Sequence, residues 1–288
     1  MAEKTVFRVR PMTINDLDQA MGLSVVEGWN QTDKDWKLLL ENAENVCIVA
    51  EKDGRIIGTA TALNHSGKVA WIGMVLVDKP MRGLGAGKML MTEIISRLKN
   101  LESVKLDATP AGQPLYNSLG FTAEYTIYRM TTPALESIKY RYSGDKPRKI
   151  NSEGLNKIIQ LDAPVFGAER GYLMNKLFDN FREKAYAFSD DKTTWGYILG
   201  RTGTKFNYIG PACAGTTEAA KGLIAAALEP FHSKPVGIDV LADKTELIEW
   251  LESIGFIKQR DFIRMYLGKN PYPGKPEFQY LISGPEFG

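Results

Sequence analysis

The sequence predicts an α/β protein built from two copies of one structural unit. Its 288 residues approach the size at which single hydrophobic cores stop growing, which favours two domains over one large one. The apolar run 69–77 (VAWIGMVLV) is typical of a strand covered on both faces, and it leads through a glycine-rich turn into an amphipathic helix. Short sequence matches then recur in the same order in the second half of the chain.

The first forty residues predict a short strand and two helices. Residues 6–10 alternate between apolar and polar side chains, as in a strand. The segments TIND (13–16) and TDKD (32–35) each predict a helix start. In such a capping box, a threonine and an acidic residue three positions later satisfy free N–H groups. Between the two helices lies the turn 27–31 (EGWNQ).

Strands follow, with two further helices between them. Residues 46–51 and 56–63 flank an Asp-Gly pair, which is a strong hairpin signal. Residues 104–108 predict another strand. A helix over 115–119 is bounded by a proline before it and a glycine after it, and 121–130 predict a further strand or strand pair.

Residues 131–150 differ in character from the segments around them, and they are basic toward their end. Such a composition is typical of a linker between domains. We therefore predict a first domain over 1–135, a linker over 136–150 and a second domain over 151–288.

The internal repeat supports this division. The matches pair 57–58 with 195–196, 71–73 with 208–210, 104–107 with 236–239, 119–121 with 254–256, and 129–130 with 264–265. The second copy has no counterpart of the glycine loop 82–87, and the alignment places Leu251 opposite Tyr116. One active half and one structural half account for this difference.

Composition excludes several classes of protein. The 36 Lys and Arg against 34 Asp and Glu leave a net charge of +2, whereas a dedicated nucleic-acid binder carries a basic surplus. The longest uncharged stretch, 108–123, contains two prolines and two glycines and is no membrane helix, and the first residues have no apolar signal core. Two cysteines, Cys47 and Cys213, predict free thiols in the cytoplasm, and with only two histidines no metal site is expected.

The glycine loop 82–88 (RGLGAGK) is the clearest chemical signal. Several N–H groups at a helix N-terminus, together with the helix dipole, favour binding of a pyrophosphate. Glycine is required where a side chain would block the phosphates or forbid the backbone angles. The spacing does not match GxxxxGK[ST], which excludes a Walker A loop. The third glycine of GxGxxG is missing, which excludes the Rossmann fingerprint. A tight turn without a ligand is the alternative.

The strand 69–77 and this loop resemble the acetyl-CoA motif [RQ]xxGx[GA] of the Gcn5-related N-acetyltransferase (GNAT) superfamily, and 115–121 (LYNSLGF) is similar to its second motif. The segments 28–31, 106–112 and 196–201 together resemble a subgroup with an intact N-terminal and a divergent C-terminal acetyltransferase domain. The resemblance implies an α/β (α+β) fold of two tandem domains, each a mixed, mostly antiparallel sheet flanked by helices. One departure is Lys79, where many members carry proline.

The resemblance also implies that the fourth strand splays from the fifth, and that acetyl-CoA enters the gap. The implied cofactor-binding residues are Met74, Val75, Leu76, Val77, Arg82, Gly83, Leu84, Gly85, Ala86, Gly87 and Lys88. Tyr116 matches the tyrosine often assigned as general acid, since a phenol of pKa about 10 stays protonated at neutral pH. A buried aromatic residue on an amphipathic helix is the alternative.

The proton acceptor is less defined by the sequence. Glu27 is the first candidate because it begins the turn that matches the substrate-side loop, Asp107 is the second, and a water chain is the third. Candidates for shaping the acceptor pocket are Trp29, Asn30 and Gln31. His65 is expected in a solvated hairpin turn, and neither it nor His232 has the Ser/Cys–Asp context of a hydrolase triad.

These features predict an N-acetyltransferase that transfers acetyl from acetyl-CoA to a small-molecule amine by direct attack in a ternary complex. A non-enzymatic acyl-CoA or metabolite sensor and a protein N-acetyltransferase are the alternatives. The expected partner is a small-molecule amine, with neither nucleic acid nor membrane. The acceptor's identity, the oligomeric state and any ligand of the second domain stay open, because a fold and a cofactor motif do not determine an acceptor.

Overall fold

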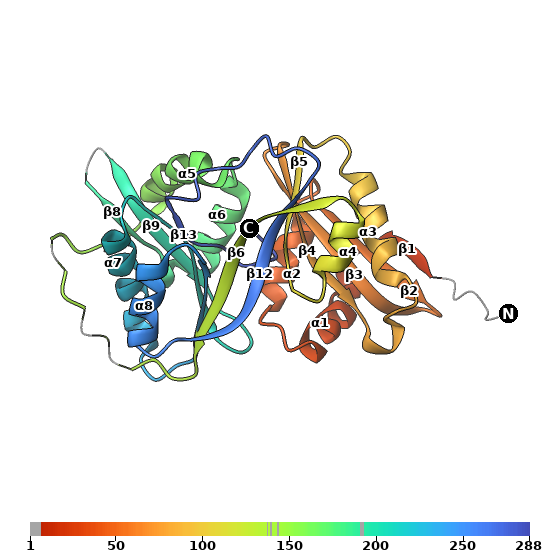
Figure 1. Ribbon diagram of the computed structural model, residues 1–288, viewed down its shortest axis with the longest axis horizontal. Coiled ribbons are helices and arrows are strands. Elements are labelled where there is room, and N and C mark those ends of the chain that lie inside the picture. The colour runs from red at the N-terminus through yellow and green to blue at the C-terminus, as the bar shows by residue number, and fades with distance from the viewer. Residues whose placement is uncertain (1–6, 137, 139, 143, 191–192) are drawn as a thin grey trace.

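A computed structural model describes residues 7–136, 138, 140–142, 144–190 and 193–288 (Figure 1). Both predicted capping boxes are present in the first half: Thr13 N–H donates to Asp16 and Thr32 N–H donates to Asp35, at 2.8 and 2.7 Å. The helices of this half are α1 (Leu17–Val26), α2 (Asp33–Glu41), α3 (Ala86–Arg97) and α4 (Gln113–Ser118). Its strands are β1 (Arg8–Pro11), β2 (Val46–Lys52), β3 (Arg55–His65), β4 (Val69–Val77), β5 (Ser103–Ala108) and β6 (Phe121–Thr132).

The second half repeats the element order of the first. Its helices are α5 (Ser152–Phe166), α6 (Gly171–Asn180), α7 (Thr217–Leu228) and α8 (Thr245–Ser253). Its strands are β7 (Arg148–Lys149), β8 (Tyr186–Ser189), β9 (Thr194–Arg201), β10 (Asn207–Ala214), β11 (Val236–Leu241), β12 (Ile257–Leu267) and β13 (Gln279–Leu281). The series from β8 to β12, with α7 and α8, matches the series from β2 to β6, with α3 and α4, and this confirms the predicted repeat. Among the described residues, no helix combines the length and apolar character needed to cross a membrane.

The two halves exchange their last strands. β12 pairs antiparallel with β5 of the first half, with Ile263 opposite Ala108 and Leu267 opposite Val104. β6 pairs antiparallel with β11 of the second half and also with β12. In Figure 1 these two long strands run side by side through the middle of the molecule. The strands of the described residues therefore form one continuous sheet across both halves.

This exchange bears on the predicted domain boundaries. Residues 1–135, 136–150 and 151–288 divide the sequence as the repeat does, and that division stays a prediction. The sheet crosses this division twice: β6 of the first segment pairs with β11 of the last, and β12 of the last segment pairs with β5 of the first. Each half of the sequence thus lacks one strand of its own sheet.

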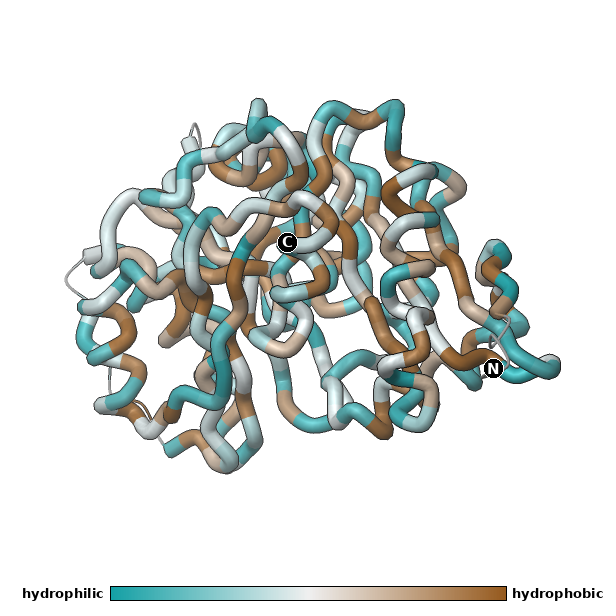
Figure 2. Tube along the Cα trace, turned by 45° about the vertical axis from the view of Figure 1, so that its right-hand side comes forward, coloured by the Kyte–Doolittle hydropathy of each residue, from teal (hydrophilic) through white to brown (hydrophobic). Residues whose placement is uncertain are grey.

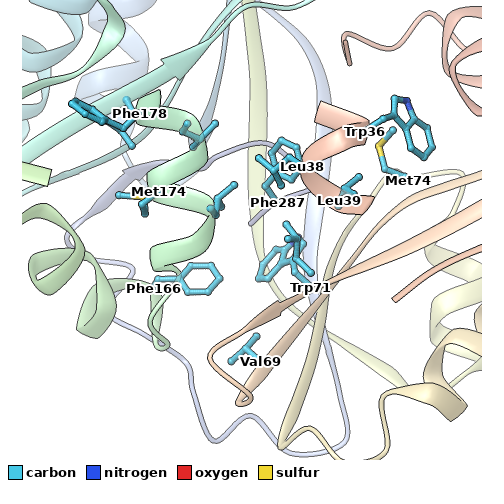
Figure 3. Packing of buried hydrophobic residues seen from close by; sticks show 14 of the residues in the cluster. Trp36, Leu38, Leu39, Val69, Trp71, Met74, Phe166, Met174, Phe178 and Phe287 are labelled. Carbon is cyan, nitrogen blue, oxygen red and sulfur yellow. The ribbon is translucent and has the colours of Figure 1, made fainter. Parts of the chain in front are cut away.

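Hydrophobic cores lie on both faces of the sheet. Alternate residues of β2 point to opposite faces, since Ile48 packs in a core with α3 whereas Val49 packs in a core with α1 and α2. The second of these cores continues into α5 and α6, and Figure 3 shows Phe166 facing Trp71 across the junction of the halves. A third core lies under α7 and α8. In Figure 2 the hydrophobic segments follow the strands and helices, while hydrophilic segments predominate in the outer loops.

The expectation that His65 is solvated is wrong. His65 lies at the end of β3, is 2 % exposed, and makes an edge-on contact of 5.0 Å between ring centroids with Phe166 of α5. Burial lowers the pKa of His65 to about 3, so the ring is neutral. The second half covers the His65 side chain, whereas Ser66, Gly67 and Lys68 of the same turn are exposed.

Because strands are exchanged and one core spans both halves, we expect the chain to unfold in a single thermal transition. Differential scanning calorimetry should give one endotherm, with a ratio of van't Hoff to calorimetric enthalpy of about 1. Two resolved endotherms would show that the halves unfold independently and would contradict this packing.

Candidate active site

The fourth strand leaves the fifth about halfway along its length. β4 and β5 pair in parallel only from Val69 with Ser103 to Ile72 with Leu106. Directly beyond, Met74 has a positive φ of 49°, and the register against β3 shifts. This bulge turns β4 away from β5. The splay that the resemblance implies is therefore present.

Two threonines of β3 stabilise the bulge. The hydroxyl of Thr59 donates to the carbonyl of Met74 at 2.7 Å, and that of Thr61 donates to the carbonyl of Gly73 at 3.1 Å. Both threonines are fully buried. A hydrogen bond of this kind contributes about 0.5–1.5 kcal/mol to stability. The shape of the opening is thus set from the β3 side of the strand.

A pocket occupies the splay, and both halves line it. The first half contributes Trp29, Gln31, Ile72, Gly73, Met74, Val75, Leu106, Asp107, Thr109, Tyr116 and Arg129. The second half contributes Arg260, Phe262, Pro285 and Glu286. A complete lining therefore requires the two halves together.

Tyr116 of α4 reaches this pocket. A Cβ atom at Gly112 would lie 2.9 Å from Cε2 of the ring, so glycine at that position leaves the space that the tyrosine occupies. Burial raises the pKa of Tyr116 to about 12, which keeps its hydroxyl protonated throughout the neutral range. The structure gives this hydroxyl no hydrogen bond among the described residues, so its proton is available.

The glycine loop lies between the end of β4 and the start of α3. Gly83 and Gly85 have positive φ angles of 78° and 94°, which a side chain would strain. The first hydrogen bond of α3 runs from the N–H of Met89 to the carbonyl of Gly85 at 3.0 Å. The preceding N–H groups have no partner within the helix, as at any helix start. The sequence predicts these groups as donors to a pyrophosphate, and that role stays a prediction.

The charged residues beside the loop differ in whether they form ion pairs. Arg82 donates to the carbonyl of Val77 at 3.1 Å and forms an ion pair of 2.6 Å with Glu27. Lys79 lies 3.8 Å from the same carboxylate. Lys88 has no ion pair among the residues that the structure describes. Arg82 thus fixes the start of the loop, whereas Lys88 is available for an anion.

The predicted acceptor residues separate into two groups. Trp29 and Gln31 line the pocket, but Glu27 and Asn30 do not. The amide oxygen of Asn30 accepts hydrogen bonds from the backbone N–H groups of Lys205 and Phe206 in the second half, at 2.9 and 3.0 Å. Its amide nitrogen donates to the carbonyl of Phe206 at 3.1 Å. Asn30 joins the halves, and Glu27 anchors the loop through Arg82. This placement weighs against the roles predicted for them.

Two buried ion pairs flank the pocket, and each joins the halves. Arg129 of β6 binds both carboxylate oxygens of Asp239 in β11, at 2.8 and 2.6 Å. Arg264 of β12 binds both oxygens of Asp107 in β5, at 2.9 and 3.0 Å. Asp107 lines the pocket but has both oxygens occupied, which weighs against it as the proton acceptor.

Sequence reasoning missed three charged residues of the pocket: Arg129, Arg260 and Glu286. A signal existed for Arg129, since the repeat places both it and Arg264 at matched positions, opposite the matched aspartates. No local signal marks Glu286, because it follows β13 in a segment whose position is set by contacts with the other half.

The second half closes its own splay. β10 and β11 pair in parallel only from Asn207 with Val236 to Ile209 with Ile238. Beyond this point β13 lies between them, with Leu281 opposite Ala212 on one side and opposite Val240 on the other. A strand of the chain itself therefore fills the position that is open in the first half.

Comparisons with known proteins agree with this architecture. The model "Acetyltransferase (GNAT) family" matches residues 13–121, and the model "Acetyltransferase (GNAT) domain" matches 158–281. The holothin acyltransferase of Pseudoalteromonas sp. (strain SANK 73390) is 22% identical over 98% of this chain and 95% of its own length. The uncharacterised N-acetyltransferase YitH of Bacillus subtilis is 24% identical over 67% of each chain.

Solved structures share the fold. A protein from Pyrococcus horikoshii superposes with a TM-score of 0.81 at 19% identity, over 98% of this chain and 96% of its own. A tandem GNAT protein from the clavulanic acid biosynthesis pathway gives 0.62 at 13% identity, over 91% and 98%. With two such domains matched in one chain, this protein belongs to the GNAT superfamily of acyltransferases and carries its domains in tandem.

Proposed function

We propose that this chain is an N-acetyltransferase that transfers acetyl from acetyl-CoA to a small-molecule amine by direct attack in a ternary complex. The observation that carries the proposal is the open splay of β4 and β5, with an unengaged, protonated tyrosine beside it and a glycine loop at its end. Family membership supports acyl transfer in general.

The loop and the strand end fit acetyl-CoA. A Cβ atom at Gly83 or Gly85 would meet nothing within 4 Å, so the face of the loop is unobstructed. The N–H groups of residues 83–88 would hold the pyrophosphate, with Lys88 adding positive charge. Residues Met74, Val75, Leu76 and Val77 end a strand that has no partner on its β5 side, and their backbone would pair with the pantetheine arm.

When bound, acetyl-CoA supplies an activated acetyl group as a thioester. Tyr116 holds a proton at its hydroxyl oxygen and donates it to the leaving sulfur. The backbone at Met74 and Val75 provides N–H donors for developing negative charge on a carbonyl oxygen.

The alternatives differ in how well the pocket fits them. Four residues of the second half line the acceptor side, which leaves little room for a polypeptide and favours a small molecule over a protein. A non-enzymatic sensor would bind its ligand in the same opening, but a sensor has no need of Tyr116 as a proton donor. Free Cys47 and Cys213 agree with the cytoplasm as the setting that we propose.

Replacing Gly85 with glutamate should abolish binding of acetyl-CoA. The new side chain places a negative charge where the loop would hold the pyrophosphate, and it fills space that is now open. Isothermal titration calorimetry should detect no binding, while the circular dichroism spectrum stays unchanged.

The matched control is Gly54→Glu. Gly54 also has a positive φ, of 76°, and open space around it, but it lies in the hairpin between β2 and β3. This variant carries the same strain and charge and should bind acetyl-CoA normally. Undiminished affinity of Gly85→Glu would remove the loop from the account.

Replacing Tyr116 with phenylalanine should lower kcat by about 10²–10⁴-fold, the usual contribution of a positioned general acid. The affinity for acetyl-CoA should change little, since the ring remains. Steady-state assays of thiol release measure the first quantity and calorimetry the second. Tyr266→Phe serves as the control, because Tyr266 does not line the pocket. Equal activity of the two variants would refute the acid role.

A further inference from the structure

Two buried oxygen atoms on residues of the pocket have no hydrogen-bond donor among the residues that the structure describes. They are Oε1 of Gln31 and Oε2 of Glu286, and these residues are 6 % and 3 % exposed. Buried acceptors without a donor are rare, because desolvation is then uncompensated. N–H groups of a ligand or of solvent are donors of the kind that these two atoms lack.

Glu286 is held in place by both halves. The indole of Trp71 donates to the carbonyl of Pro285 at 3.0 Å, and a Cβ atom at Gly73 would lie only 2.7 Å from Cα of Glu286. Arg201 donates to Oε1 of Glu286 and also pairs with Asp35 at 3.0 Å. Oε1 of Glu286 is thus used within the protein, and Oε2 has no donor within the described part of the chain.

Arg260 is the pocket's cation without a counter-ion. Arg129 is paired with Asp239, but Arg260 has neither an ion pair nor a hydrogen bond among the described residues. It lies half-buried on β12, where a guanidinium is partly stripped of water. A guanidinium in such a position binds carboxylates through two parallel N–H donors.

These groups define a site of mixed charge. We propose that the acceptor is an amine that also carries a carboxylate, in the class of free amino acids. Its ammonium group lies at Gln31 and Glu286, and its carboxylate lies at Arg260. Asp107 and Arg129 do not compete for it, because each already has its partner. This inference rests on the proposed N-acetyltransferase function.

The same arrangement supplies a proton acceptor. The ammonium must lose a proton before its nitrogen can attack a thioester. Oε2 of Glu286 takes that proton, so the carboxylate becomes a carboxylic acid as the ammonium becomes an amine. The second half, which has closed its own splay, thereby contributes a carboxylate to the site of the first.

The test compares L-amino acids with the corresponding amino acid amides in a thiol-release assay with acetyl-CoA. The amides keep the ammonium but lack the carboxylate. We expect kcat/KM to be at least about tenfold higher for the free amino acid, as for loss of a charge-assisted hydrogen bond. Arg260→Gln should raise KM for the amino acid by at least about tenfold and leave the amide unaffected, which abolishes the preference.

Two further variants separate specificity from folding. Lys258→Gln removes an exposed positive charge two positions away on the same strand and should behave as the natural chain. Glu286→Gln keeps the size of the side chain and should lower kcat for amino acid and amide alike. Thermal melting checks that each variant is folded.

The outcomes distinguish this inference from the function on which it rests. Turnover of amides as fast as amino acids, or equal effects of Arg260→Gln on both, would overturn the acceptor class while the acetyltransferase function survives. Bound acetyl-CoA without thiol release for any amine would overturn both.

Discussion

Two reciprocal ion pairs between arginine and aspartate hold the exchanged strands in place. Arg129 reaches Asp239 in the second half, and Arg264 reaches Asp107 in the first, so the repeat generates the same pair twice with its members swapped between halves. All four side chains are buried or nearly so. Removing one member of a buried pair leaves an uncompensated charge and lowers the stability of the fold by about 3–5 kcal/mol. One member of each pair, Asp107 of one and Arg129 of the other, lines the pocket.

The same pair of splayed parallel strands is open in the first half and closed in the second. In each half, two parallel strands pair briefly and then separate. In the first half the gap stays open beside the glycine loop. In the second half β13 fills the gap, and the segment after it continues to Pro285 and Glu286 at the pocket of the first half. The second copy has therefore lost an opening of its own and become part of the neighbouring site.

Local features could be predicted from the sequence because their signals are local. The capping boxes at Thr13 and Thr32, the glycine loop and the position of Tyr116 all depend on residues a few positions apart. The strand exchange could not be predicted, since pairing a last strand with either half satisfies the same hydrophobic pattern. The positions of Asn30 and Glu286 could not be predicted for a related reason, because both depend on residues far away in the sequence. Asn30 binds Lys205 and Phe206, and Glu286 lies between Arg201 and Gly73.

The number of acetyl-CoA molecules that one chain binds tests this account most directly. Calorimetric titration of the natural chain should give a stoichiometry of one per chain, because only the first half has an open splay and a glycine loop among the described residues. Two sites per chain would show that β13 does not close the second half. A stoichiometry of zero would show that the open splay of the first half is not a site for acetyl-CoA.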